Sequence, residues 1–368
     1  MRSFGDVRRV VVKLGTNVLT TDEELDREFV YDIARQIARL RERGLEVCVV
    51  SSGAIGLGAR ELGITGRVQD VVLRQACAAV GQPVLMHVYR EAFASCDIIA
   101  AQTLITREAL DGRSSYVRLR NAVERLLELG VVPVFNENDS VATAEIGTAF
   151  GDNDQLSALV SSKVDAGLLI LLSDVDGYYD RDPRHHSNAA KRDTVELVGP
   201  EMIQAAGKPG SALGTGGMAT KLKAVRIAAD GGCRVVLAHG REKDVLPRIL
   251  AGEPVGTVFA PRRTLRNRTR WLLHSAPRGT IHVDHGAMDA IRHHKSLLPT
   301  GIVAVDGNFD AGEVVLVNDQ AKLVSAFSSG ELNSVIGKHS SEVARILGPH
   351  DDRRVIARPE DMVFLDDD

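Results

Sequence analysis

The chain has 368 residues, of which 44% are hydrophobic and 26% are charged. This composition is ordinary for a soluble globular protein, and the length allows two domains with a substantial core. The formal net charge of −4 gives no general attraction to nucleic acid or to an anionic membrane. The longest apolar stretch, at 168–172, is too short to cross a bilayer, and residues 1–9 lack the apolar segment of a signal peptide.

The cysteines indicate a reducing compartment. Four are scattered along the chain without a C-x-x-C pair, and Cys48, Cys77 and Cys233 lie in apolar or helical contexts. We expect reduced, buried thiols, and therefore a cytoplasmic protein with no membrane partner.

Strand and helix signals alternate through the first 260 residues. Short apolar runs predict strands at 10–12, 47–50, 98–104, 131–135, 168–172 and 233–238, with a candidate edge strand at 255–259. Helical spacing predicts helices at 26–43, 115–129 and 218–229, one opened by residues 151–154, and helical stretches up to residue 95 that break near 81–83. This alternation predicts an α/β fold, with a mainly parallel sheet sandwiched by helices.

Beyond residue 260 the pattern changes. Five arginines fall between 262 and 270, and short strand signals follow at 280–283, 301–305, 314–317 and 321–326. We therefore divide the chain into a first domain at 1–260, an arginine-rich linker at 261–274, a small β-rich domain at 275–357 and a tail at 358–368.

Polar residues stand at the carboxyl ends of four predicted strands: Lys13, Ser52, the segment 136–139, and the pair Ser173 and Asp174. Each of these alone is also typical of a turn. Because ligands bind at the carboxyl ends of strands in such sheets, the four loops together predict one shared site.

A glycine-rich loop at 214–217 leads into the predicted helix at 218–229. Its backbone N–H groups and the positive end of the helix favour a polyphosphate, and Lys221 adds a full charge. The loop lacks the Gly-Lys-Ser/Thr ending of a P-loop, and no clear strand precedes it, as a dinucleotide fingerprint requires. A flexible surface loop with a solvated lysine is the other interpretation.

Two lysines, an anion-binding loop and several carboxylates suit phosphoryl transfer. Asp154 and Asp174 could hold Lys13 and Lys221 in place or contact Mg²⁺, directly or through water. No Ser/His or Cys/His pair stands at the strand ends, and the histidine pairs at 185–186 and 293–294 lie in polar, loop-like contexts without metal-ligand spacing, so we expect surface histidines and assign no residue as a metal ligand. A general base is unnecessary if the acceptor is itself an anion.

In combination, the segments 11–17, 51–55, 136–145, 151–154 and 214–221 closely resemble the amino acid kinase family, from Arg9 to the C-terminus and in the same order. Within that family the resemblance is to the enzymes that use ATP to phosphorylate the side-chain carboxylate of L-glutamate. The product is glutamyl 5-phosphate, and the reaction is the first step of proline biosynthesis.

The resemblance also implies roles for individual residues. Lys13 and Lys221 would stabilise the transferring phosphoryl group and Asp154 would orient them, as the catalytic residues. Ser52, Asp139 and Asn153 would bind L-glutamate, with Asp139 facing the α-ammonium. Ser173 stands where threonine is common, which keeps a hydroxyl. The residues that would bind Mg-ATP are Lys13, Ser173, Asp174, Thr215, Gly216, Gly217, Met218, Ala219, Thr220 and Lys221.

Other implications concern partners. Members of the family are often inhibited by proline and form homo-oligomers, and their product is used by glutamyl phosphate reductase. The C-terminal part, around 307–314, resembles a PUA domain, a module that binds RNA elsewhere. That part carries a net charge of about −2, from eight Lys/Arg and ten Asp/Glu between 278 and 357, which disfavours nucleic acid as a partner.

Two alternatives remain open from the sequence. One is a kinase of the same fold acting on another small acid, such as aspartate or N-acetylglutamate, although the segment 136–139 and the trailing domain argue against it. The other is an RNA-binding protein that uses the PUA-like domain. Retention of both lysines and of the loop at 214–221 argues against that.

Overall fold

The computed structural model describes residues 2–21, 24–66, 68–106, 110, 113–141, 153–206, 217–261, 267–347 and 353–365. The chain divides into two compact units, one ending at Thr264 and the other beginning at Leu265. The segment from 207 to 216, which includes residues 214–216 of the glycine-rich loop, and the segment from 142 to 152 lie outside the described residues.

In the described part of the first unit an eight-stranded sheet has the order β10-β12-β11-β7-β1-β4-β6-β5. The neighbours from β11 to β5 are all parallel, whereas β12 runs antiparallel to β11. The strands are β1 (Arg9–Leu14), β4 (Glu46–Val50), β5 (Ala100–Ile105), β6 (Val132–Glu137), β7 (Leu168–Ser173), β10 (Thr194–Val195), β11 (Arg234–His239) and β12 (Thr257–Phe259). The predicted parallel sheet is confirmed, but the predicted edge strand is internal, because β10 pairs with its outer side.

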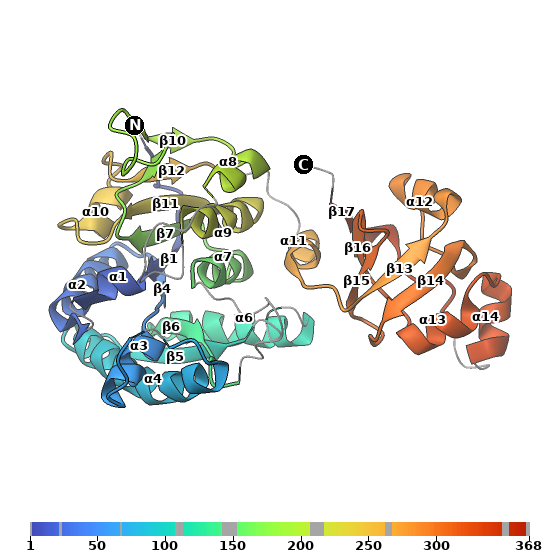
Figure 1. Cartoon of the computed structure of the whole chain (residues 1–368), viewed down its shortest axis with the longest axis horizontal. Helices are drawn as coiled ribbons and strands as arrows, with labels where there is room; N and C mark the ends of the chain where they lie inside the picture. Colours follow the sequence, from blue (N-terminus) through green and yellow to red (C-terminus); the bar gives the residue numbers. More distant parts are fainter. Residues whose placement is uncertain are drawn as a thin grey trace. The chain divides into compact units, whose positions relative to one another are not determined.

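Helices cover both faces of this sheet (Figure 1). They are α1 (Thr16–Leu19), α2 (Arg27–Glu42), α3 (Ala54–Glu61), α4 (Val71–Ala94), α6 (Arg113–Glu128), α7 (Asn153–Lys163), α8 (Pro200–Ala205), α9 (Met218–Asp230) and α10 (Val245–Leu250). Two short ribbons also form, β2 (Thr20–Thr21) with β3 (Glu24–Leu25) and β8 (Tyr178–Tyr179) with β9 (Lys191–Arg192).

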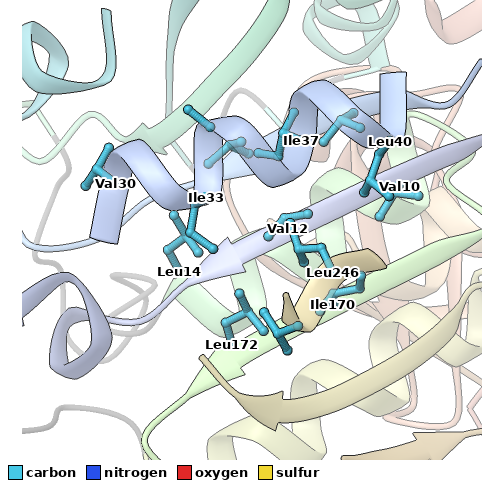
Figure 2. Packing of buried hydrophobic residues seen from close by; sticks show 14 of the residues in the cluster. Val10, Val12, Leu14, Val30, Ile33, Ile37, Leu40, Ile170, Leu172 and Leu246 are labelled. Atoms are coloured by element: carbon cyan, nitrogen blue, oxygen red, sulfur yellow. The ribbon is translucent and has the colours of Figure 1, made fainter. Parts of the chain in front are cut away.

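Successive side chains of a strand point to opposite faces of the sheet, so they belong to two different hydrophobic cores. Val10, Val12 and Leu14 of β1 pack with α2 and with Leu246 of α10, as Figure 2 shows from close by. Val11 packs on the opposite face with residues of α7 and α9. Because side chains on a strand alternate between faces, Lys13 shares the face of Val11. The buried pattern of β1 therefore directs a lysine toward α7 and α9.

The helix α4 runs unbroken through Pro83, so the prediction of a break near 81–83 is wrong. Its buried positions, including Leu85, Val88 and Phe93, recur at helical spacing and pack against the sheet and α2. This packing offsets the hydrogen bond that proline removes. Among the described residues, α4 is the one helix long and apolar enough to cross a bilayer, a test that core helices of globular domains also pass.

Gly81 serves close packing of α4 against α3. A Cβ atom at Gly81 would lie 1.9 Å from the carbonyl oxygen of Ala54, and one at Gly58 would lie 1.7 Å from that of Cys77. Neither glycine has a positive φ. Both are therefore required by the approach of two backbones, and the glycine at 81 does not mark a turn.

In the second unit, the described residues form a five-stranded sheet of order β14-β13-β15-β16-β17. Its hydrophobic core includes Ile281, Leu323 and Phe327. Its elements are α11 (Asn267–His274), β13 (Gly279–Val283), α12 (His285–Arg292), η1 (Pro299–Gly301), β14 (Ile302–Gly307), β15 (Val314–Val317), β16 (Ala321–Val324), α13 (Ser329–Val335), α14 (Ser340–Leu347), η2 (Pro359–Asp361) and β17 (Met362–Phe364).

The unit is larger than the β-rich domain placed at 275–357. The last eight residues of the predicted linker form α11, whose Trp271 is buried with Leu272 and Val314. The predicted tail contributes β17, which pairs antiparallel with β16. Neither segment carries a strong apolar pattern, because each contributes only a few side chains to the core.

We expect Gly58→Ala to destabilise the first unit by about 2 kcal/mol or more, since the new methyl group overlaps the backbone of α4. Gly56→Ala is the matched control on the same helix, where a Cβ atom meets nothing within 4 Å. Alanine there should stabilise by roughly 0.5 kcal/mol, because glycine is a poor helix former. Urea unfolding of both variants checks this, and equal stabilities would contradict it.

Candidate active site

Strand register aligns the polar residues at one rim of the sheet. Lys13 is paired with Leu171 of β7 on one side and with Val50 of β4 on the other, and Val50 is paired with Phe135 of β6. The carboxyl ends of β7, β1, β4 and β6 therefore lie side by side at one edge of the sheet. The predicted convergence of the four strand ends is confirmed as geometry.

A buried carboxylate lies between the two lysines. Asp154, in the first turn of α7, is 1% exposed, and its Oδ1 is 2.5 Å from the Nζ atom of Lys13. Its Oδ2 is 3.5 Å from the Nζ atom of Lys221. Both lysines are also buried. One carboxylate thus fixes two ammonium groups from β1 and α9 at a single point.

The helix α9 begins at Met218, with Gly217 as its N-cap and without a side-chain cap. Lys221 is in its first turn and is buried, whereas Met218, Ala219 and Thr220 are partly exposed. The hydroxyl of Thr220 donates to the carbonyl oxygen of Gly217 at 2.7 Å. Helix N-termini attract anions, so this end of α9 suits a phosphate. Thr215 and Gly216 lie outside the described residues.

Asp174 follows β7 at the same rim. It accepts hydrogen bonds from Asn17 Nδ2 at 2.7 Å and from the Ser173 hydroxyl at 2.9 Å. Desolvation raises the pKa of Asp174, but these hydrogen bonds and the charge of Lys221 outweigh it and hold the pKa below its ordinary value. The carboxylate is therefore ionised near neutral pH. Asn17 is within a motif noted in the sequence, but nothing there assigned it a role.

Asn153 connects the rim to the loop after β4. Its Nδ2 donates to the carbonyl oxygen of Ser51 at 2.5 Å, to the hydroxyl of Ser52 at 3.2 Å and to Oδ1 of Asn136 at 2.8 Å. Asn136 in turn donates from Nδ2 to Oε1 of Gln82 at 2.7 Å. Gln82 carried no signal in the sequence, because it lies within α4, far from any predicted strand end.

Asp139 lies two residues beyond β6 and is half-buried. Burial raises its pKa to about 6, against the opposing influence of the Arg74 charge. Among the described residues no hydrogen bond or ion pair joins Asp139 to Asn153 or Ser52. The structure therefore brings Ser52 and Asn153 into contact, and in the part of the chain that it describes it shows no direct contact of either residue with Asp139.

No group of three or more His, Cys, Asp or Glu side chains that could hold a metal occurs in the described ranges. The histidine pairs at 185–186 and 293–294 are exposed. Cys48, Cys77 and Cys233 are buried and, like Cys96, are free thiols.

Comparison with known proteins identifies a family for each of the two units. Residues 8–239 match the model of the amino acid kinase family, and residues 279–347 match the PUA domain. A protein of Methanosarcina barkeri named "Glutamate 5-kinase" is 44% identical over 96% of both chains. One of the same name from Geobacter sulfurreducens is 42% identical over 95% of this chain and 96% of its own.

We expect Asp139→Asn to stabilise the unliganded protein at pH 7.5 by roughly 1 kcal/mol, because the buried carboxylate is ionised there at a cost. The folded pKa of about 6 exceeds the ordinary value of 3.8, so the folded state binds more protons between these values. Stability is then lost as pH rises through about 6. The advantage of the asparagine variant should shrink as pH falls toward 4.

Thermal unfolding across this pH range measures the difference. Asp6→Asn is a control of opposite sign, because a hydrogen bond from Arg234 lowers the pKa of Asp6. That variant should lose stability at pH 7.5. An Asp139→Asn variant that is less stable than the parent at pH 7.5 would show that the carboxylate has a partner that compensates its burial.

Proposed function

Because the chain belongs to the amino acid kinase family and groups with its glutamate 5-kinases, we propose that it transfers the γ-phosphoryl group of ATP to the side-chain carboxylate of L-glutamate. The product is glutamyl 5-phosphate, formed in the first step of proline biosynthesis. The observation that carries the proposal is the buried Asp154 with Lys13 and Lys221 on its two oxygens, at the rim where the strands end.

The chemistry requires charge neutralisation more than proton transfer. A carboxylate acceptor is already an anion, so it can attack phosphorus without a general base. The difficulty is the repulsion between the acceptor and the triphosphate, and two ammonium groups reduce it. Asp154 holds both ammonium groups in place before substrates bind, so little reorganisation is needed in the transition state.

The nucleotide end of the site lies at α9. We assign the phosphates to the first turn of this helix, to Lys221 and to the loop at 214–217, with Ser173 and Asp174 also on the nucleotide. Mg²⁺ prefers oxygen ligands and keeps several waters, so it fits this site as a companion of the phosphates, with the ionised Asp174 as a carboxylate that could contact it or its waters. When bound, the metal supplies further neutralisation of phosphate charge.

The acceptor end lies at Ser52, Asn153 and Asp139. The two N–H bonds of Asn153 are directed at protein oxygens, so the amide presents its Oδ1 to a ligand. An amide oxygen and the Asp139 carboxylate suit the α-ammonium of L-glutamate. N-acetylglutamate lacks that ammonium group, and the match to glutamate 5-kinases over nearly the whole chain disfavours both it and aspartate.

We also propose a cytoplasmic homo-oligomer. The four free cysteines suit a reducing compartment. Val71, Val72 and Val84 of α4 remain exposed, which leaves apolar surface for a second copy. Proline as a feedback inhibitor and coupling to glutamyl phosphate reductase are further proposals that rest on the family, since acyl phosphates hydrolyse readily and gain from prompt reduction.

The decisive experiment incubates the protein with Mg-ATP, L-glutamate and hydroxylamine, which traps an acyl phosphate as a hydroxamate. We expect hydroxamate with L-glutamate, and little with aspartate or N-acetylglutamate in parallel reactions. Product with another acid alone would move the substrate assignment to that acid. If no acceptor responds, salt-sensitive filter binding of tRNA tests the RNA-binding alternative.

We expect Lys221→Ala to lower kcat by at least about a hundredfold, the scale for losing a charge contact in the transition state. Lys223→Ala is the matched control, because Lys223 lies on the same helix but is exposed. Steady-state kinetics of the hydroxamate reaction measure both variants. Near-normal turnover of Lys221→Ala would mean that the phosphoryl site lies elsewhere.

A further inference from the structure

Asn136 connects the acceptor end of the site to α4. Its side chain is buried near the end of β6, and its Oδ1 accepts from the backbone N–H of Glu137 at 3.0 Å and from Nδ2 of Asn153 at 2.8 Å. An amide oxygen has two lone pairs, so these two donors use it fully. The orientation of the Asn136 amide is therefore determined, and its NH₂ group needs an acceptor on the other side.

Gln82 of α4 supplies that acceptor. Its Oε1 accepts from Nδ2 of Asn136 at 2.7 Å, and no second acceptor of this NH₂ group occurs in the part of the chain that the structure describes. If the Asn136 amide turned around, its NH₂ group would face two other donors. Without Gln82, a buried NH₂ group would have no partner, which costs free energy. Asn136 would then gain by leaving the position in which it accepts from Asn153.

Two further contacts hold α4 beside the site. At Gly81 the backbone of α4 approaches that of α3 so closely that no side chain fits between them. Two turns later, the buried hydroxyl of Tyr89 is 2.9 Å from that of Ser51, whose carbonyl oxygen accepts from Asn153. Residues seven apart share one face of a helix. The face of α4 that carries Gln82 and Tyr89 therefore contacts two partners of Asn153.

Gln82 is an unfavourable residue for stability in this position. Its side chain is 8% exposed, and its own Nε2 atom has no hydrogen-bond partner among the described residues. Burying an unpaired amide donor costs free energy, which an apolar side chain of the same length avoids. Residues that conflict with the rules of stable folding are expected at functional sites. The contact with Asn136 is the feature that accounts for a glutamine here.

We propose that Gln82 is a positioning residue for binding of the acceptor. It acts through the Asn136 amide, which holds Asn153, the residue assigned above to L-glutamate. The inference rests on the proposed function, because that function gives Asn153 its ligand. It extends the machinery of the site from the ends of the strands to the interior of α4.

Gln82→Met tests the inference, because methionine has nearly the same length and removes both the acceptor and the unpaired donor. We expect KM for L-glutamate to rise about three- to tenfold, the scale for losing one hydrogen bond. KM for ATP and kcat should change little, since Asp154 remains paired with Lys13 and Lys221. The unfolding temperature should be nearly unchanged, because one unpaired buried donor replaces another.

Gln36→Met is the matched control for loss of a buried glutamine. Gln36 is 1% exposed, and both ends of its amide are paired, since it accepts from the backbone N–H of Leu246 and donates to Asp32. This variant should lower the unfolding temperature and leave KM for L-glutamate unchanged. The two variants thus separate a contact with the site from the loss of a buried amide.

A double-mutant cycle with Asn153→Ala shows whether Gln82 acts through Asn153. The measured quantity is kcat/KM for L-glutamate in the hydroxamate reaction, which stays measurable when KM exceeds the accessible concentrations. Gln82→Met should lower it about three- to tenfold in the parent. In the Asn153→Ala background it should lower it less than about twofold, because changes to one shared contact are not additive.

An unchanged KM for L-glutamate in Gln82→Met, or an equal loss in both backgrounds, would overturn the positioning role and leave the proposed function standing. A parent enzyme that acts only on another acid would overturn the substrate assignment, and the same cycle with that acid then decides the role of Gln82. A parent enzyme without activity on any acceptor would overturn both.

Discussion

Two buried ammonium groups close to each other repel, and the site can exist only because Asp154 pairs with both. A carboxylate in the first turn of a helix is also stabilised by the helix dipole, so α7 favours the ionised form that the lysines need. The three charged groups come from β1, α7 and α9, which pack together on one face of the sheet. The electrostatics of the site and the packing of that face therefore depend on each other.

Alternation along the strands explains why the sequence predicted so much of this arrangement. The apolar run before Lys13 indicated a buried strand, and its period of two determines which face the lysine takes. The carboxyl ends of parallel strands meet at one edge, so Ser52 and Ser173 could be expected near Lys13. None of this required knowledge of side-chain contacts.

The features that the sequence did not predict depend on contacts between distant segments. Gly81 and Pro83 are local signals of a break, yet the close approach of α3 and the packing of α4 on the sheet override them. Gln82 has no local signal, because its importance arises from Asn136, which reaches it only when the sheet is complete. In the second unit, α11 and β17 form within the predicted linker and tail, where each supplies few apolar side chains and so leaves a weak pattern in the sequence.

The position of β1 in the middle of the sheet has a consequence for synthesis. As the chain leaves the ribosome, β1 can pair on one side with β4 soon after it emerges, but its other partner, β7, comes much later. During that interval one edge of a largely apolar strand stays unpaired, and such edges promote aggregation. The central strand that carries Lys13 is thus also a segment of the nascent chain that gains from protection by a chaperone.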